Sequence, residues 1–384
     1  MERRIKNCEM LSAAIVASSF SSPNRADVGP TRRLRNGALF PMLGLGVGNM
    51  QRDDVEKVAA FATDYELRVG LIDTAMASAN ADVLSRVPRV TNGETWVLTK
   101  VWYTHLGYFR TKLAVEEEIF KYGRPSLDAV LLHWPRCDDA IGWMNCEAEE
   151  NALLPHVKRA GPPPHLHQRR DSNDSEPWVG SWRALEELHA AGRISGAIGI
   201  SNFDAQTLRR LLALPELTTK PHVLQGNVWS VVFDPELMRL CEEHDILFQA
   251  YAVLSSTVGA PPPPRTNTAR FERWARASEA LKEIGAELSG QSESGAESTA
   301  AGNAAVTVAQ VIQRWLMQRG VSVVPRATTA THVVENARVR ELHALTPAQM
   351  RHVQTAVEEL LRALNGLPPG AGWRRSANNN VNEL

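Results

Sequence analysis

Cysteine is scarce in this chain: its 384 residues include only Cys8, Cys137, Cys146 and Cys241. The intervals between them lack the short, paired spacing of a zinc site, and four cysteines in so long a chain do not indicate a disulfide framework. We therefore expect no metal site. So few cysteines are typical of a reducing compartment, and we expect the protein to be cytoplasmic.

An excess of charge of one sign is also missing, because 42 basic and 43 acidic residues give a formal net charge of −1. This balance removes the main electrostatic reason to expect nucleic acid or an anionic membrane as a partner. No uncharged apolar run reaches the roughly 18 residues of a membrane-spanning helix. Hydrophobic residues nevertheless make up 43% of the chain, which is enough for a large core, so we expect a soluble monomer.

The two ends of the chain differ from the rest. Basic residues at positions 3, 4 and 6 precede an apolar, serine-rich stretch over residues 11–20, which loosely resembles a targeting segment. Glu2 and Glu9 weaken that interpretation, because targeting segments carry few acidic residues. Residues 1–33 are therefore either a disordered leader, which we favour, or a presequence that directs the protein to an organelle. Residues 367–384 have the composition of a flexible tail.

Eight short apolar runs, separated by amphipathic segments, begin shortly after Leu34. Most are continuously apolar rather than alternating, which is typical of parallel strands that are covered on both faces. The segments between them show helical periodicity, as at residues 54–65, 182–189 and 308–317. This order predicts a (β/α)8 barrel, with an open doubly wound sheet as the alternative. The runs are Pro41–Gly46, Gly70–Asp73, Thr95–Thr99, Leu127–His133, Gly196–Ser201, His222–Gln225, Ile246–Tyr251 and Val321–Pro325.

Two long segments interrupt the alternation, at about residues 136–180 and 256–305. The second is expected to hold a helix at about Ser278–Leu288. A low-complexity stretch follows over residues 289–303, with too few apolar side chains to pack. We place the barrel at residues 34–366 and expect both insertions at the face that carries the chemistry, where barrel loops vary most freely.

From the second run to the eighth, each run ends in, or is followed by, a polar or ionisable residue. The carboxyl ends of barrel strands meet at one face, so these side chains are predicted to line one pocket. Any one of them alone would be explained equally well as a capping or turn residue, but seven runs ending in this way indicate a site. The residues are Asp73, Lys100, His133, Ser201, Asn202, Gln225, Tyr251 and Arg326.

Longer motifs surround these residues, and they include Leu71–Ala75, Leu98–Trp102, Leu131–Pro135, Ala197–Phe203 and Val323–Arg326. In this order they resemble the aldo-keto reductase superfamily, whose members are NADPH-dependent barrel enzymes. The similarity extends from Leu34 to Leu364, apart from the two insertions. The resemblance implies a small carbonyl substrate, an aldehyde or ketone, that is reduced to an alcohol with NAD(P)H.

Four side chains carry the reaction in this family: an Asp, a Tyr, a Lys and a His. Asp73, Lys100 and His133 match three of them, but Ser78 stands at the expected tyrosine position, and no tyrosine occurs between Asp73 and Lys100. The chain therefore resembles a divergent member that lacks the usual proton donor, and the helix expected over residues 78–87 is shortened. Tyr103, Tyr108, a water held by Ser78, or His133 itself are the candidate replacements.

The resemblance also implies a site for NADP(H) along the same face. Ser201, Asn202 and Gln225 would hold the nicotinamide carboxamide, and Tyr251 would stack on the ring. The full set of implied cofactor contacts is Gly46, Val47, Ser201, Asn202, Gln225, Tyr251, Leu254, Arg326, Thr329, His332, Glu335 and Asn336.

The phosphate end departs from the family pattern at two positions. Arg326 would pair with the 2′-phosphate, a role that suits the planar guanidinium, and Glu335 and Asn336 would reach the adenine. Ala327 stands where a hydroxyl residue usually assists, and His332 replaces a second arginine. We therefore expect NADPH to be preferred over NADH by a reduced margin.

Three functions remain open from the residues. The first is reduction of a carbonyl with an altered proton donor. The second is a regulatory or sensor protein that binds NADP(H) without turnover, and the third is a Schiff base between Lys100 and a carbonyl substrate. Gly48 occupies a position where the family often has tryptophan, so we expect one aromatic wall of the substrate pocket to be absent. Residues in or near the first insertion and in the tail are candidates to rebuild an apolar wall, although packing within these segments explains each of them equally well: Trp134, Trp143, Met144, Trp178 and Trp373.

Overall fold

The computed structural model describes residues 29–64, 66–139, 141–165, 176–255, 257–258, 262, 268–292 and 305–365. The predictions for residues 1–28, for residues 293–304 and for the tail lie outside the described residues. Within the part of the chain that is described, no helix is long and apolar enough to cross a bilayer.

Eight parallel strands form one sheet, in which each strand pairs with the next one along the chain. Each of the eight predicted apolar runs overlaps one strand, so these segments were read correctly as parallel strands. The strands are β3 (Leu45–Gly46), β4 (Leu71–Asp73), β5 (Trp96–Val101), β6 (Leu127–Leu132), β7 (Ile194–Ser201), β8 (Val223–Asn227), β9 (Leu247–Tyr251) and β10 (Ser322–Val323).

The sheet closes on itself, which excludes the open doubly wound alternative. The segment that leads into β3 pairs in parallel with the end of β10, through bridges from Leu43 to Val323 and from Gly46 to Arg326. Gly46 makes this approach feasible, because a Cβ atom at that position would lie only 3.0 Å from the carbonyl oxygen of Val324. The prediction of a (β/α)8 barrel is therefore confirmed.

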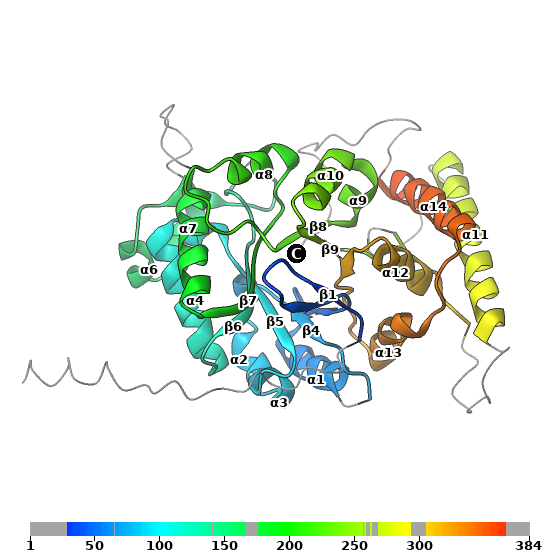
Figure 1. Cartoon of the computed structure of the whole chain (residues 1–384), viewed down its shortest axis with the longest axis horizontal. Helices are drawn as coiled ribbons and strands as arrows, with labels where there is room; N and C mark the ends of the chain where they lie inside the picture. Colours follow the sequence, from blue (N-terminus) through cyan, green and yellow to red (C-terminus); the bar gives the residue numbers. More distant parts are fainter. Residues whose placement is uncertain are drawn as a thin grey trace, which may run out of the picture.

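Helices surround the barrel (Figure 1). Those predicted at residues 54–65, 182–189 and 308–317 are α1 (Arg52–Thr63), α7 (Pro177–Ala190) and α12 (Val308–Gln318). Their apolar sides face the sheet, as in α1, where Val55, Val58 and Ala62 are buried. The others of this ring are α2 (Ala81–Leu84), α3 (Pro88–Thr91), α4 (Tyr108–Tyr122), α8 (Ala205–Leu212), α9 (Val228–Phe233), α10 (Pro235–Glu243), α13 (Ala330–Arg338) and α14 (Pro347–Asn365).

A hairpin of β1 (Thr31–Arg33) and β2 (Leu39–Pro41) precedes the barrel, so ordered structure begins slightly before the expected start at Leu34. It covers the amino-terminal ends of the strands. Asn36 Nδ2 donates to the carbonyl of Gly196 at 2.6 Å, and the Phe40 ring packs edge-on against Trp96, with centroids 5.3 Å apart. The hairpin thus covers this end of the barrel, and the cavity described below lies at the opposite end, at the carboxyl ends of the strands.

Both insertions contain helices. The first holds α5 (Cys146–Ala152) and α6 (Pro155–Arg159). In the second, α11 (Thr268–Ser292) is longer than the predicted helix and packs along α14 (Figure 1). The expectation that nothing packs from Ser289 onward was wrong at the start of that stretch, because Ser289 Oγ accepts the backbone N–H of Val306 at 2.9 Å.

Two histidines, the buried His222 and the half-buried His189, lie together at the amino-terminal end of the barrel. His222 Nδ1 accepts the backbone N–H of Ile198 at 3.2 Å, and the rings of His222 and His189 are 5.2 Å apart. Burial, followed by the nearby charges of His189 and Arg35, lowers the pKa of His222 to about 4. The folded chain therefore holds this imidazole neutral well below the pH at which a free histidine takes up a proton.

Candidate active site

A cavity of about 670 Å³ lies at the carboxyl ends of the strands. It is lined by residues from almost every strand of the barrel and from the loops that follow them. Ten residues singled out in the sequence contribute to the lining: Gly46, Asp73, Ser78, Lys100, His133, Asn202, Gln225, Tyr251, Leu254 and Arg326. Val47 and Ser201 are fully buried next to lining residues, whereas Thr329, His332, Glu335 and Asn336 lie beyond Arg326, on or next to α13.

A buried ion pair forms the floor of the cavity. Lys100 Nζ donates to Asp73 Oδ1 and to the carbonyl oxygen of Thr74, both at 2.7 Å. Gln225 Nε2 donates to the same Asp73 oxygen at 2.8 Å. An ammonium has three N–H donors, so one donor of Lys100 is left for the cavity that it lines. Asp73 and Gln225 therefore hold the cation in place and direct it at whatever binds there.

His133 follows β6 beside this pair. Burial, and to a smaller extent the charge of Lys100, hold the pKa of His133 well below its usual range. Its Nδ1 is buried and has no hydrogen-bond partner among the described residues, so Nε2 is the nitrogen on the cavity side. A neutral imidazole there can donate one hydrogen bond, but it does not carry the extra proton that an acid would transfer.

Neither of the two candidate tyrosines reaches the cavity. Tyr103 lies in the 3-10 helix η2 (Tyr103–His105), is fully buried, and donates its hydroxyl to Glu149. Tyr108 begins α4 and donates to Glu187 at the surface. Tyr251 is the only tyrosine among the described lining residues, so the structure does not support a direct tyrosine replacement for the missing acid.

Ser78 does line the cavity, at the end of the 3-10 helix η1 (Met76–Ser78). A Cβ atom on Gly48 would lie 3.8 Å from Ser78 Oγ, so the hydroxyl faces the loop after β3. The predicted shortening is present: the segment after β4 folds only into η1, α2 and α3, each of three or four residues.

The opposite side of the cavity has the properties of a dinucleotide cleft. Asn202, with a left-handed φ of 60°, donates through Nδ2 to the His133 carbonyl at 3.0 Å and accepts from the Tyr251 hydroxyl at 2.7 Å. This bridge fixes the half-buried Tyr251 ring along the wall. Ser201 Oγ, next to Asn202 in the chain, is buried without a hydrogen-bond partner among the described residues.

A positive charge, that of Arg326, lies at the end of the cavity next to α13. Arg326 is exposed on the rim and forms no ion pair with the described residues. It precedes α13, whose first turn is capped by Thr329 Oγ1 accepting the backbone N–H of His332 at 3.3 Å. A free guanidinium beside a helix N-terminus suits a phosphate.

Glu335 and Asn336 are engaged inside the protein on α13. Glu335 accepts from the Thr307 hydroxyl, and Asn336 Oδ1 accepts from Gln313 Nε2 at 2.7 Å. The Nδ2 group of Asn336 is buried and has no partner among the described residues. Both side chains thus join α13 to α12, and they lie outside the described cavity.

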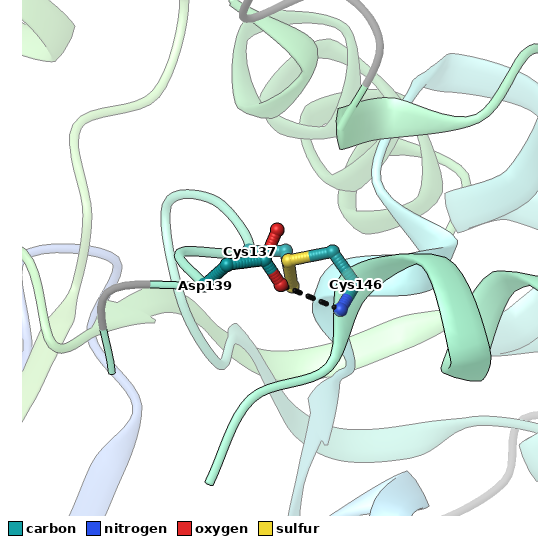
Figure 2. Close-up of side chains that lie close together, drawn as sticks. All are labelled: Cys137, Asp139 and Cys146. Atoms are coloured by element: carbon teal, nitrogen blue, oxygen red, sulfur yellow. Dashed lines mark hydrogen bonds between the residues drawn. A yellow bond between two sulfur atoms is a disulfide. The ribbon is translucent and has the colours of Figure 1, made fainter. Parts of the chain in front are cut away.

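Two features of the first insertion were missed from the sequence. Cys137 and Cys146 form a disulfide with Cα atoms 5.8 Å apart (Figure 2). The expectation of no disulfide was therefore wrong, because the turn that brings the two residues together has no signature in their spacing. Asp139 lies beside them and accepts the Cys146 backbone N–H at 3.0 Å. The three side chains lie close enough to group as metal ligands, but both thiols are consumed in the disulfide.

The second missed feature is Glu149, in the helix α5 that starts at Cys146. It lines the cavity together with Trp102 and Trp134, and Trp143 packs against both indoles, with ring centroids 6.1 and 5.6 Å away. Of the tryptophans singled out in the sequence, Trp134 lines the cavity, and it does so together with Trp102, which was not expected there. Glu149 adds a carboxylate to this apolar side. A lone glutamate in a polar insertion carries no sequence signal of this position.

The comparisons with known proteins agree with this architecture. The family model described as "Aldo/keto reductase family" matches residues 42–358. The "Uncharacterized oxidoreductase YtbE" of Bacillus subtilis is 26% identical over 334 residues, which cover 85% of this chain and 92% of that protein. "Glycerol 2-dehydrogenase (NADP(+))" of Hypocrea jecorina is 27% identical over 321 residues, covering 81% and 88%.

The fold matches solved structures as well. MGS-M4, described as an aldo-keto reductase enzyme from a Medee basin deep-sea metagenome library, has a TM-score of 0.60 and 21% identity. The match covers 85% of this chain and 94% of that one. Fold and family model together define the class: an oxidoreductase barrel. The chain belongs to the aldo/keto reductase family.

Proposed function

We propose that this protein reduces the carbonyl group of an aldehyde or ketone to an alcohol with NADPH. The observation that carries the proposal is the buried Asp73–Lys100 pair, whose remaining N–H donor points into a cavity next to a neutral His133. The cavity continues to Arg326, which has no ion pair with the described residues and suits a cofactor with a 2′-phosphate. The relative in Hypocrea jecorina is named for an NADP-dependent reaction of the same type.

When bound, the cofactor supplies a hydride to the carbonyl carbon, and the electron pair of the C=O π bond moves to the oxygen. Lys100 Nζ and His133 Nε2 would each donate a hydrogen bond to that oxygen. Donors that are held in place and aimed at developing negative charge are among the strongest contributions to catalysis. Asp73 holds the lysine in position through the hydrogen bond of 2.7 Å.

The alkoxide then needs a proton, and we propose that a water held between Ser78 Oγ and Lys100 delivers it. Tyr103 and Tyr108 are engaged elsewhere, and His133 is neutral. The proton lost by the water is replaced from solvent through the open mouth of the cavity. Loss of a fixed general acid typically costs a factor of about 10² to 10⁴ in rate, so we expect slow turnover.

A Schiff base on Lys100 has less support. Its nitrogen is an ammonium paired with Asp73, and an ammonium has no lone pair with which to attack a carbonyl carbon.

The test uses the purified full-length chain with NADPH that carries deuterium at the transferable position of the nicotinamide. An aldehyde panel is incubated with it, and the alcohols are analysed by mass spectrometry. Deuterium on the carbinol carbon supports the proposal. Fluorescence of NADPH in the same samples reports binding. Binding without deuterium transfer to any substrate would instead support the regulatory alternative, and absence of binding would refute both.

Ser78→Ala and Ser78→Tyr test the proton donor. If a water on Ser78 donates the proton, Ser78→Ala lowers kcat and Ser78→Tyr, which restores a phenol opposite Gly48, raises it. Identical rates for both variants and the wild type would show that Ser78 does not take part.

A further inference from the structure

The end of the cavity that is lined by Trp102, His133 and Trp134, here called the substrate end, also contains Glu149. The reduction of a carbonyl does not require a carboxylate at this position. Glu149 stands on α5, at the edge of the cavity, where His133, Trp134 and Trp102 are its neighbours in the lining. Its two oxygens accept separate hydrogen bonds: Trp102 Nε1 donates to Oε2 at 2.7 Å, and the Tyr103 hydroxyl donates to Oε1. Each oxygen retains a lone pair, because a carboxylate oxygen accepts more than one hydrogen bond.

Both neighbours of the Glu149 carboxylate are hydrogen-bond donors. Burial first, and then the hydrogen bond and charge of Glu149, raise the pKa of Tyr103 far above its usual range, so the tyrosine remains a donor. The carboxylate is therefore held on its inner side, and its outer side is open to the cavity that it lines.

No positive charge in the described lining compensates Glu149. The charged lining residues are Asp73, Lys100, Glu149 and Arg326. Asp73 and Lys100 neutralise each other at 2.7 Å, and Arg326 lies at the far end, where the cofactor phosphate would use its charge. The substrate end consequently carries one net negative charge, and it is enclosed by indole rings, whose faces attract cations.

The helix that carries Glu149 is fixed at several points. Asn145 caps its N-terminus by accepting the Ala148 backbone N–H at 3.1 Å, and the disulfide joins Cys146 to Cys137. The next residue, Glu150, forms a buried two-point ion pair with Arg110, with both bonds at 2.8 Å. Because Glu150 anchors α5 on one side, Glu149 is held at the cavity on the other.

We propose that Glu149 is a specificity-determining residue that selects carbonyl substrates bearing a cationic group, such as a substituted ammonium, a few bonds from the carbonyl. The inference rests on the proposed function. The ammonium would lie between the free side of the carboxylate and the faces of Trp102 and Trp134, while the carbonyl oxygen meets Lys100 and His133.

The test compares para-(trimethylammonio)benzaldehyde with para-tert-butylbenzaldehyde, which have nearly the same shape and differ in charge. We expect the wild type to favour the cation in kcat/KM by about ten-fold, the equivalent of about 1.4 kcal/mol. Glu149→Gln should abolish this preference, so that the ratio of the two kcat/KM values falls to about one. The matched control is Glu147→Gln, because Glu147 is exposed on the same helix and should leave the preference unchanged.

A second measurement does not depend on the variant folding. In the wild type, the preference for the cationic aldehyde should fall as KCl is raised from about 0.05 to 0.5 M, because salt screens the attraction. Equal kcat/KM values for the two aldehydes at low salt would overturn the inference while leaving the reductase function intact.

If neither aldehyde is turned over, the role of Glu149 is tested by binding alone, and the aldehyde panel described above decides the proposed function separately. Calorimetric titration with the two corresponding benzyl alcohols, in the presence of NADP+, then gives the comparison. Tighter binding of the cationic alcohol to the wild type, lost in Glu149→Gln, supports the charge-selective pocket. Equal or weaker binding of the cation refutes it.

Discussion

Replacement of Lys100 by methionine separates the structural role of the buried ion pair from its chemical role. The side chains of Lys100 and Asp73 are only 5% and 11% exposed, and the ammonium donates two hydrogen bonds of 2.7 Å. Lys100→Met keeps much of the side-chain volume but leaves Asp73 buried, with Gln225 as its remaining side-chain donor among the described residues. Breaking a buried pair in this way costs about 3–5 kcal/mol of stability.

The same substitution removes a donor that faces the reacting oxygen. We expect kcat to fall by a factor of about 10² to 10⁴, the range that is typical for loss of one such donor or acid. In the double variant Lys100→Met/Asp73→Asn no uncompensated charge remains, so most of the lost stability should return. Turnover should stay low, because neither substitution restores a donor to the cavity.

Thermal and denaturant unfolding measure the loss of stability. The rate of NADPH oxidation under saturating aldehyde measures the loss of kcat. Lys282→Met is the matched control: its ammonium pairs with Glu279 at the surface, with both side chains more than 60% exposed, so stability should change by less than about 1 kcal/mol. A Lys100→Met protein that turns over within about three-fold of the wild type would refute the assignment of Lys100 to the reacting oxygen. A double variant no more stable than the single one would refute the compensation argument.

The remaining predictions concern stability, cofactor choice and the disulfide. The free energy of unfolding should fall as the pH drops from about 6.5 to 4, because the folded pKa of His222 is lowered and only the unfolded chain takes up that proton. At pH 5, uptake of this proton by the unfolded chain lowers the free energy of unfolding by about 2 kcal/mol relative to neutral pH. His222→Asn should remove this loss of stability, whereas His343→Asn at the surface should not. Arg326→Ala should raise the Kd for NADPH about ten-fold and leave that for NADH nearly unchanged, as read from cofactor fluorescence; equal effects on both would contradict a phosphate contact. Replacing Cys137 and Cys146 by serine should cost up to about 2–3 kcal/mol and reduce the preference for a cationic aldehyde. Dithiothreitol should reproduce both changes in the wild type and have no effect on the double variant.

The barrel and the floor of its cavity could be predicted because a short stretch of sequence is enough to show that a strand is buried on both faces. A run such as Leu127–His133 is apolar throughout, which requires cover on both faces, and its final polar residue marks the carboxyl end. Asp73, Lys100 and His133 follow from that pattern, since parallel strands bring their ends to one face. The local pattern does not distinguish a closed barrel from an open doubly wound sheet. Closure depends on backbone contacts between the first and last strands, such as that of Gly46 with the end of β10.

The structure of the first insertion could not be predicted from the same pattern. Its helices lie outside the repeating strand and helix pattern, so nothing in the spacing relates Cys137 to Cys146 or Glu149 to the cavity. Tyr103 illustrates the same limit: next to a cavity residue in the chain, it is nevertheless directed away from the cavity and donates to Glu149. The position of a loop side chain depends on contacts with residues distant in the sequence, and these exist only after the barrel has formed.

The sequence by itself determined the eight strands, the order of the polar residues at their ends and the absence of a tyrosine between Asp73 and Lys100. Those features follow from local burial and from strand direction. Only the tertiary structure decided which side chains share the cavity, that His133 is held neutral there, and that a carboxylate from the first insertion stands among the tryptophans. Burial and distance set these properties, and both arise from packing between segments far apart in the chain.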